Sequence, residues 1–171
     1  MKKSYRELIE MLCTPEGWTE AYPVLLEAGA AAIPDVITGL THSDPKIRKW
    51  CAAFFDHHAS KEAVPAIIRA LDDPSAEVRR HAVHAIGCQR CKLDPLPVDV
   101  VAHLIRKATK DESIRVRRSA VHLLGLQRND PRIAAGLERI LNSETDEKLL
   151  SNARYALAEQ RKENRRDARR E

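Results

Sequence analysis

The sequence lacks the features that mark a membrane protein or a common class of enzyme. No apolar run approaches the roughly 18 residues that a membrane-spanning helix needs, and the charged, periodic N-terminus has no signal-peptide core. A glycine-rich phosphate loop, a Ser-His-Asp arrangement and a paired-carboxylate signature are missing as well. We therefore expect a cytoplasmic protein with no membrane association, and a binding function is favoured over a catalytic one.

The sequence also has few cysteines and a small net charge. The 171 residues include four cysteines, but Cys13 and Cys51 fall on predicted helix faces, so reduced thiols are expected rather than a disulfide framework. The net charge is +4, yet residues 161–171 alone contribute six basic and three acidic side chains. The remaining 23 basic and 22 acidic residues almost cancel, which weakens any nucleic-acid or membrane-surface interpretation based on bulk charge.

What the sequence does contain is a repeat. Residues 77–87 read EVRRHAVHAIG, and residues 114–125 repeat this pattern as IRVRRSAVHLLG at an offset of 38. The same frame appears upstream as KIRKWCAAFFD, aligned on Ile47, and downstream as KLLSNARYALA, aligned on Leu149. Periods between 31 and 38 residues predict a solenoid of stacked units.

Each repeat is predicted to contain two helices. Val64, Ile67, Ile68 and Leu71 recur at helical spacing, the letters DDPS interrupt the period, and it resumes at Val78. One helical pair cannot bury both of its apolar stripes, so neighbouring repeats must stack to close the core. The sequence thus predicts an all-α fold, a right-handed α-solenoid of about five helical hairpins.

The hairpins are expected to form one domain over residues 1–160, followed by a charged tail over residues 161–171. In the first hairpin, Trp18 and Tyr22 are expected to cover the open end of the core, with a ligand-binding tryptophan as the alternative. A six-residue insertion within CQRCKLDPLPVD predicts a loop that leaves the stack. The hairpins span residues 4–29, which act as an N-terminal cap, 30–59, 60–97, 98–129 and 130–160.

The second full repeat resembles a known family. Its pattern Val-Pro-x-Ile-Ile-x-x-Leu, then Asp-Asp-Pro, then Val-Arg-x-x-Ala-x-x-Ala-Ile-Gly is similar to the short HEAT-like repeats of the phycobilisome-lyase type, over roughly residues 30–160. The resemblance implies a fold more than a function, because binding proteins, chromophore lyases, a DNA-repair glycosylase family and deoxyhypusine hydroxylase share this scaffold. That hydroxylase holds iron with His-Glu pairs, and no histidine here precedes a glutamate.

The resemblance also implies a structural role for one set of charged residues. In HEAT-like proteins, arginines just after the start of the second helix pair with aspartates in the turns of adjacent repeats. The matching arginines in this sequence are Arg48, Arg79 and Arg117, and the turn aspartates are Asp44, Asp73 and Asp111.

Another set of residues is expected to bind a partner. Second helices line the concave face of such solenoids, and outward basic side chains on them form a groove suited to carboxylate or phosphate groups. The predicted partner-binding residues are Lys49, Trp50, Ala53, Arg80, His81, His84, Arg118 and His122.

One cysteine pair raises the question of a metal site. Cys88 and Cys91 form a Cys-x-x-Cys knuckle, and with His57 and His84 they would supply four ligands for a tetrahedral zinc ion. The second knuckle that strong zinc motifs contain is missing from the sequence. We therefore favour a packed cysteine and an ordinary loop thiol, and predict no cofactor.

These patterns predict a non-catalytic, monomeric HEAT-repeat scaffold that binds a protein or peptide through its concave face. One alternative is a nucleic-acid-binding HEAT-like protein with a glycosylase-like groove, for which Trp50 and Asp56 would only be guesses at catalytic residues. Another is a metal-dependent or lyase-type HEAT enzyme or accessory. Nucleic acid is expected to bind weakly and without sequence preference, with a Kd of roughly 10⁻⁴ to 10⁻⁶ M.

Overall fold

The computed structural model describes residues 3–91, 95–128 and 130–167, and every regular element in these ranges is a helix. The all-α prediction is confirmed. The chain forms two compact units, the first made of Met1–Ile86 and Arg90–Val98, the second of Gly87–Gln89 and Asp99–Glu171. Each helix in the described ranges is too short or too polar to span a lipid bilayer.

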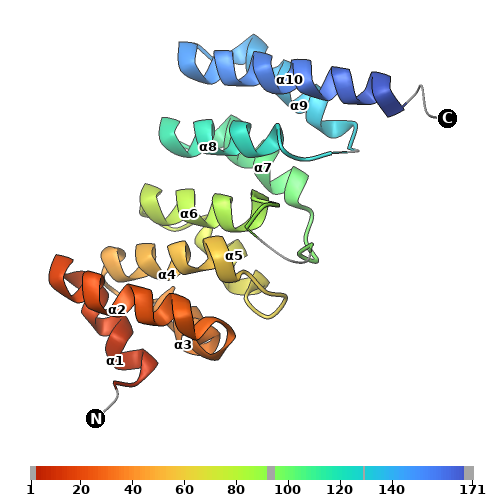
Figure 1. Ribbon diagram of the computed structural model, residues 1–171. Helices are drawn as coiled ribbons and strands as arrows, with labels where there is room; N and C mark the ends of the chain where they lie inside the picture. The colour runs from red at the N-terminus through yellow and green to blue at the C-terminus, as the bar shows by residue number, and fades with distance from the viewer. Residues whose placement is uncertain (1–2, 92–94, 129, 168–171) are drawn as a thin grey trace. The chain divides into compact units, whose positions relative to one another are not determined.

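The first unit is a series of helical hairpins (Figure 1). Its helices are α1 (Tyr5–Glu10), α2 (Pro15–Ala28), α3 (Ile33–Gly39), α4 (Pro45–His58), α5 (Val64–Ala70) and α6 (Ala76–Gly87, of which residues 76–86 belong to this unit). Helix α1 packs against α2 and α3, and α4 contacts α2, α3 and α5. Successive hairpins therefore share one core, as the repeat predicts.

Helix starts in this unit follow from the side chains that precede them. Ser4 and Glu7 form a capping box, in which the Glu7 amide donates to Ser4 Oγ (3.3 Å) and the Ser4 amide donates to Glu7 Oε2 (2.7 Å). At α4, Asp44 Oδ1 accepts from the Lys46 amide (2.7 Å), and Pro45 presets the first helical φ. The Asp-Pro pair thus sets where α4 begins.

The core of the first unit is centred on α4. Phe54 and Phe55 are 1% and 0% exposed, and their rings meet edge to face with centroids 5.4 Å apart. A Cβ atom on Gly39 would collide with Cys51 Sγ, so a glycine is needed where α3 and α4 approach each other. Cys51 is a free thiol, and its burial raises its pKa to about 12, so the thiol stays protonated at neutral pH.

The second unit contains α7 (Val100–Lys110), α8 (Ile114–Leu124), α9 (Arg132–Ser143) and α10 (Glu147–Asp167). Helices α7 and α10 each pack against both α8 and α9. A buried amide ladder crosses this unit: Gln127 Nε2 donates to the Gly87 carbonyl (2.7 Å), and Gln160 Nε2 donates to the Gln127 carbonyl (2.6 Å).

Parts of the sequence-based predictions fall outside the described residues. Helix α10 extends to Asp167 within the predicted tail, and residues 168–171 of that tail are not described. The same holds for residues 92–94 of the predicted loop and for Asn129, which ends the fourth predicted hairpin. Each of the helices α1 to α9 falls within a single predicted hairpin, and a short 3-10 helix at Gly29–Ala32 crosses the boundary between the first two.

In three successive repeats (residues 30–59, 60–97 and 98–129), one arginine closes the turn that precedes its own helix. Arg48 Nη1 donates to the His42 and Ser43 carbonyls, both at 2.9 Å. Arg79 and Arg117 make the same two bonds, to the carbonyls of residues 73 and 74 and of residues 111 and 112, at 2.9 to 3.3 Å. The arginine thus satisfies two turn carbonyls that lie outside any helix.

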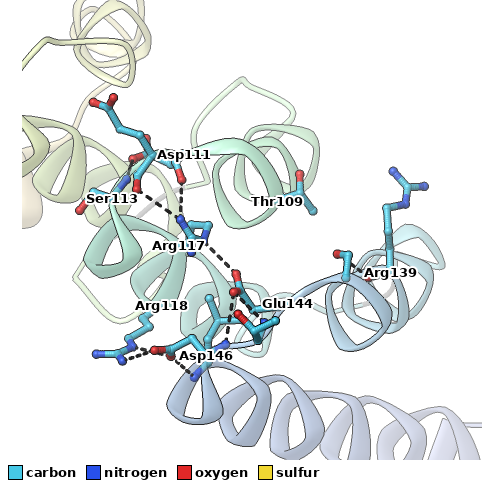
Figure 2. A network of polar contacts seen from close by, with 12 residues as sticks. Thr109, Asp111, Ser113, Arg117, Arg118, Arg139, Glu144 and Asp146 are labelled. Carbon is cyan, nitrogen blue, oxygen red and sulfur yellow. Dashed lines mark hydrogen bonds and ion pairs between the residues drawn. The ribbon is translucent and has the colours of Figure 1, made fainter.

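Arg48 and Arg117 also bind a carboxylate in the following turn. Arg48 Nε and Nη2 donate to the Asp73 carboxylate at 2.8 and 3.1 Å, and Arg117 Nε donates to Glu144 at 3.0 Å (Figure 2). The Arg48 and Asp73 side chains are only 12% and 8% exposed, so this pair is largely removed from water. Its geometry is bidentate, which is the arrangement in which a buried pair is best compensated.

Removing Arg48 should leave the Asp73 carboxylate buried without its guanidinium. Breaking a buried pair in this way costs roughly 3 to 5 kcal/mol, so Arg48→Ala should lower the free energy of unfolding of the first unit by about that amount. Urea unfolding followed by tryptophan fluorescence measures this loss, because both tryptophans of the chain lie in that unit.

Lys3→Ala is the matched control for this measurement. The Lys3–Glu20 pair is 48% and 59% exposed, so its loss should change the free energy of unfolding by less than about 0.5 kcal/mol. If Arg48→Ala is no more destabilised than Lys3→Ala, the buried pair contributes nothing net to stability.

Candidate functional site

The second helices of the first unit, α2, α4 and α6, present a face of aromatic and polar side chains. Helical spacing explains why these side chains share one face. Trp18 and Tyr22 are four residues apart, as are Arg80 and His84, and residues at this spacing lie on the same side of a helix. We call this surface the second-helix face. It consists of Trp18, Tyr22, Lys49, Trp50, Asp56, Glu77, Arg80, His81 and His84, and so includes five of the eight predicted partner-binding residues.

Three aromatic rings form a cluster between α2 and α4. Trp18 and Trp50 stack with centroids 4.7 Å apart, and Tyr22 lies 5.3 Å from Trp50. Burial raises the pKa of Tyr22, and the neighbouring Asp56 raises it further, so the phenol stays neutral. The indole nitrogen of Trp18 is buried and has no acceptor among the described residues, which is uncommon for a buried donor.

A hollow of about 300 Å³ opens beside the two tryptophans, and we call it the tryptophan hollow. Lys49 Nζ lies 3.7 Å from the Trp50 ring centroid, a cation–π contact. Burial lowers the pKa of Lys49, and the nearby charges of Arg80 and Lys46 lower it further, against the opposing effect of Glu77. The hollow is lined by Leu12, Cys13, Thr14, Pro15, Trp18, Lys46, Lys49 and Trp50.

Two histidines of α6 hold a carboxylate of α4. His81 Nδ1 lies 2.8 Å from Asp56 Oδ2, and His84 Nδ1 lies 3.1 Å from Oδ1. A carboxylate can only accept, so the His81 imidazole donates. Burial alone would raise the pKa of Asp56, but the hydrogen bond with His81 and the close approach of the His84 imidazole outweigh burial and hold it below its usual value.

The other predicted residues of this face have internal partners or are covered. Arg80 Nη2 donates to Glu77 Oε2 at 3.1 Å and lies 3.1 Å from His81 Nε2. Ala53 is 4% exposed and therefore offers little surface to a partner. Much of the positive charge that the sequence assigns to this face is thus already balanced within the protein.

In the second unit, α8 carries the predicted residues Arg118 and His122. Arg118 Nε and Nη2 donate to the two carboxylate oxygens of Asp146 at 3.0 and 2.6 Å (Figure 2). These bonds raise the pKa of Arg118 and lower that of Asp146. His122 is exposed. Asp111, a predicted turn aspartate, is buried and accepts from Lys107 Nζ at 3.2 Å.

Three of the four metal candidates come from one continuous segment, residues 84–91. His84, Cys88 and Cys91 each place one ligand atom within 4.8 Å of the other two. His57 lies apart from this group and lines a hollow of about 580 Å³ together with His58, whose pKa is lowered by burial and by the nearby His57.

Sequence reasoning did not anticipate the role of Asp56 or that of Glu77. A signal for Asp56 was present, because Arg48 and Asp73 are 25 residues apart and so are Asp56 and His81. The second pair therefore lies eight residues further along the chain on both sides, which places it between α4 and α6. Glu77 precedes Arg80 by three residues, the spacing of an ordinary helical ion pair.

The comparison with protein families matches residues 33–104 to HEAT repeats. This range contains α3 to α6, and with them most of the second-helix face. The resemblance to HEAT repeats that was inferred from the sequence is therefore confirmed over residues 33–104. A search of curated proteins gave no match.

Solved structures of similar fold are helical repeat proteins. The complex of CpcE and CpcF of phycocyanin lyase from Nostoc sp. PCC7120 is similar with a TM-score of 0.75 and 20% identity, covering 89% of this chain and 96% of that chain. A designed armadillo repeat protein in complex with the peptide (KR)4 is similar with a TM-score of 0.56 and 17% identity. The match covers 92% of this chain and 82% of that chain. At these identities the likeness establishes the α-solenoid fold alone, as predicted.

Neutralising Asp56 should destabilise the first unit in a pH-dependent way. Because the folded pKa of Asp56 lies below its unfolded value, its contribution to stability is present above about pH 4 and is lost as the pH falls through the folded pKa. Asp56→Asn should therefore lower the free energy of unfolding by about 1 to 3 kcal/mol at neutral pH, and by less near pH 3.

Denaturant unfolding at both pH values checks this expectation, with Glu27→Gln, an exposed carboxylate of α2, as the control. A loss for Asp56→Asn that is independent of pH would mean that it comes from packing rather than from the charge on the carboxylate.

Proposed function

We propose that this chain is a non-catalytic binding module whose second-helix face holds a protein or peptide segment. The observation that carries the proposal is the cluster of Trp18, Tyr22 and Trp50 beside the tryptophan hollow. Tryptophan and tyrosine dominate the energetically important positions of protein interfaces, particularly where they border a pocket.

The comparisons support binding as the general use of this scaffold. The CpcE and CpcF structure is a complex of two proteins, and the designed armadillo repeat protein is in complex with a peptide. A rigid stack of helices presents side chains at fixed spacing, which suits recognition of an extended segment. Because the likeness is in fold only, the partner of this chain has to be inferred from its own residues.

The remaining features of the proposed module follow from its charge and thiols. We expect it to act as a monomer in the cytoplasm, where Cys13 and Cys51 stay reduced. Nucleic acid should bind only weakly, because the arginines of the predicted groove have carboxylate partners, as in Arg80 with Glu77 and Arg118 with Asp146.

Selection from a peptide library tests the proposal, because it assumes nothing about the partner. Peptides that bind the wild-type chain should lose roughly 30-fold in affinity for Trp50→Ala, which corresponds to about 2 kcal/mol for an aromatic residue at the centre of an interface. Fluorescence anisotropy of the labelled peptides measures this change, and circular dichroism checks that the variant keeps its helices.

Tyr155→Ala serves as the control, since Tyr155 is 70% exposed and lies in the second unit. It should bind the selected peptides as the wild type does. Peptides that bind wild type and Trp50→Ala equally well would place the binding surface away from the second-helix face.

A further inference from the structure

We propose that the tryptophan hollow binds an acidic peptide segment, with one large apolar side chain in the hollow and flanking carboxylates on Lys46 and Lys49. This inference rests on the proposed function and adds the chemistry of the partner. The volume of about 300 Å³ is at the lower end for a small-molecule site, so it suits a single leucine or phenylalanine side chain better than a cofactor. Its walls are mostly apolar, with Leu12 and Pro15 beside the two indole rings.

The charge of the partner follows from which cations are paired. Arg48 is bound to Asp73 and Arg80 to Glu77. In the part of the chain that the structure describes, by contrast, neither Lys46 nor Lys49 has a carboxylate within ion-pair distance. Both lysines line the hollow, so a carboxylate next to the inserted side chain would meet them.

The surroundings of Lys49 strengthen this argument. Its ammonium lies over the Trp50 ring, is partly buried, and is near the positive charges of Lys46 and Arg80. Each of these last two features disfavours the charged form, which is why the pKa of Lys49 is lowered. An incoming carboxylate would reverse that effect, and its attraction to Lys49 is strengthened by the poor solvation of the site.

Single-stranded nucleic acid fits these observations less well than an acidic peptide. Base recognition needs free aromatic faces, but Trp50 already stacks on Trp18 and carries Lys49 over its ring. Two lysines neutralise few phosphates, and the carboxylates of Asp56 and Glu77 on the same face repel a polyanion. A peptide with a few acidic residues requires only a local positive charge.

Four short synthetic probes test the proposal on the full chain. They are an acidic peptide with a central phenylalanine, the same peptide with alanine at that position, a basic peptide with a central phenylalanine, and oligothymidylate. Intrinsic fluorescence is the readout, because the two tryptophans of the chain both line the hollow. The acidic phenylalanine peptide should bind saturably, about tenfold or more tighter than each of the other probes, and more weakly as salt is raised.

Charge-neutral variants locate the binding site. Lys46→Gln combined with Lys49→Gln should weaken binding of the acidic phenylalanine peptide by roughly 30-fold, because the two lost contacts contribute roughly 1 kcal/mol each at a partly exposed site. Arg69→Gln is the matched control, since Arg69 is an exposed cation on the first-helix side of the same unit, in α5. It should leave the affinity unchanged, and circular dichroism confirms that each variant is folded.

The outcomes separate this inference from the proposed function. Equal binding of the alanine peptide or of oligothymidylate would show general attraction of polyanions and overturn the inference, as would binding that is insensitive to the two lysine substitutions. If library selection yields Trp50-dependent peptides that are basic or neutral, the proposed function stands and only the acidic partner is wrong. If no Trp50-dependent peptide emerges and the acidic probe does not bind, both are wrong.

Discussion

The structure depends on one guanidinium that serves two turns. Arg48 and Arg117 each use Nη1 to close the turn before their own helix, and Nε to bind a carboxylate in the following turn. Only arginine offers several donors in one fixed plane, so both sets of bonds form in a single rotamer, whereas a lysine ammonium is a point donor on a flexible stem. Within each unit, the start of one second helix is thereby fixed relative to the turn that precedes the next second helix. A backbone constraint and a charge pair are combined in one side chain.

The second-helix face follows from this constraint. Once Arg48 fixes Asp73 at an offset of 25 residues, the two helices α4 and α6 proceed from matched starting points, and two turns later the same offset places Asp56 against His81. The bond from His81 to Asp56 is therefore a consequence of the repeat register as well as of local chemistry. Rigid helices with fixed register also explain how Trp50 meets Trp18 and Tyr22 of the preceding hairpin, because each ring is held by its own helix rather than by a loop.

The repeat pattern was sufficient to predict the helical hairpins, because apolar spacing and Asp-Pro turns are local signals that recur from one repeat to the next. It was also sufficient for the Arg48–Asp73 contact, through the family resemblance. Ala53 shows where such reasoning stops, because an alanine predicted to contact a partner is only 4% exposed. The aromatic cluster was only partly predictable. Tyr22 and Trp18 belong to a degenerate first hairpin whose alignment on the later repeats is weak, so their contact with Trp50 depends on packing that a repeat pattern does not encode.

The number of basic residues on the second helices is a poor guide to the charge that these helices present to a partner. Counting basic residues on the second helices suggested a cationic groove, but Arg80, Arg118 and His81 each lie against a carboxylate of the same unit, respectively Glu77, Asp146 and Asp56. An arginine already engaged by a carboxylate must exchange that partner before it can bind a phosphate, so its contribution to polyanion binding is smaller than its formal charge suggests. Lysine behaves differently, because its ammonium is strongly hydrated and tolerates the absence of a protein partner at low cost. Beside the aromatic rings, the cations that line the hollow are Lys46 and Lys49, which is why the partner that we propose presents a carboxylate and an apolar group together.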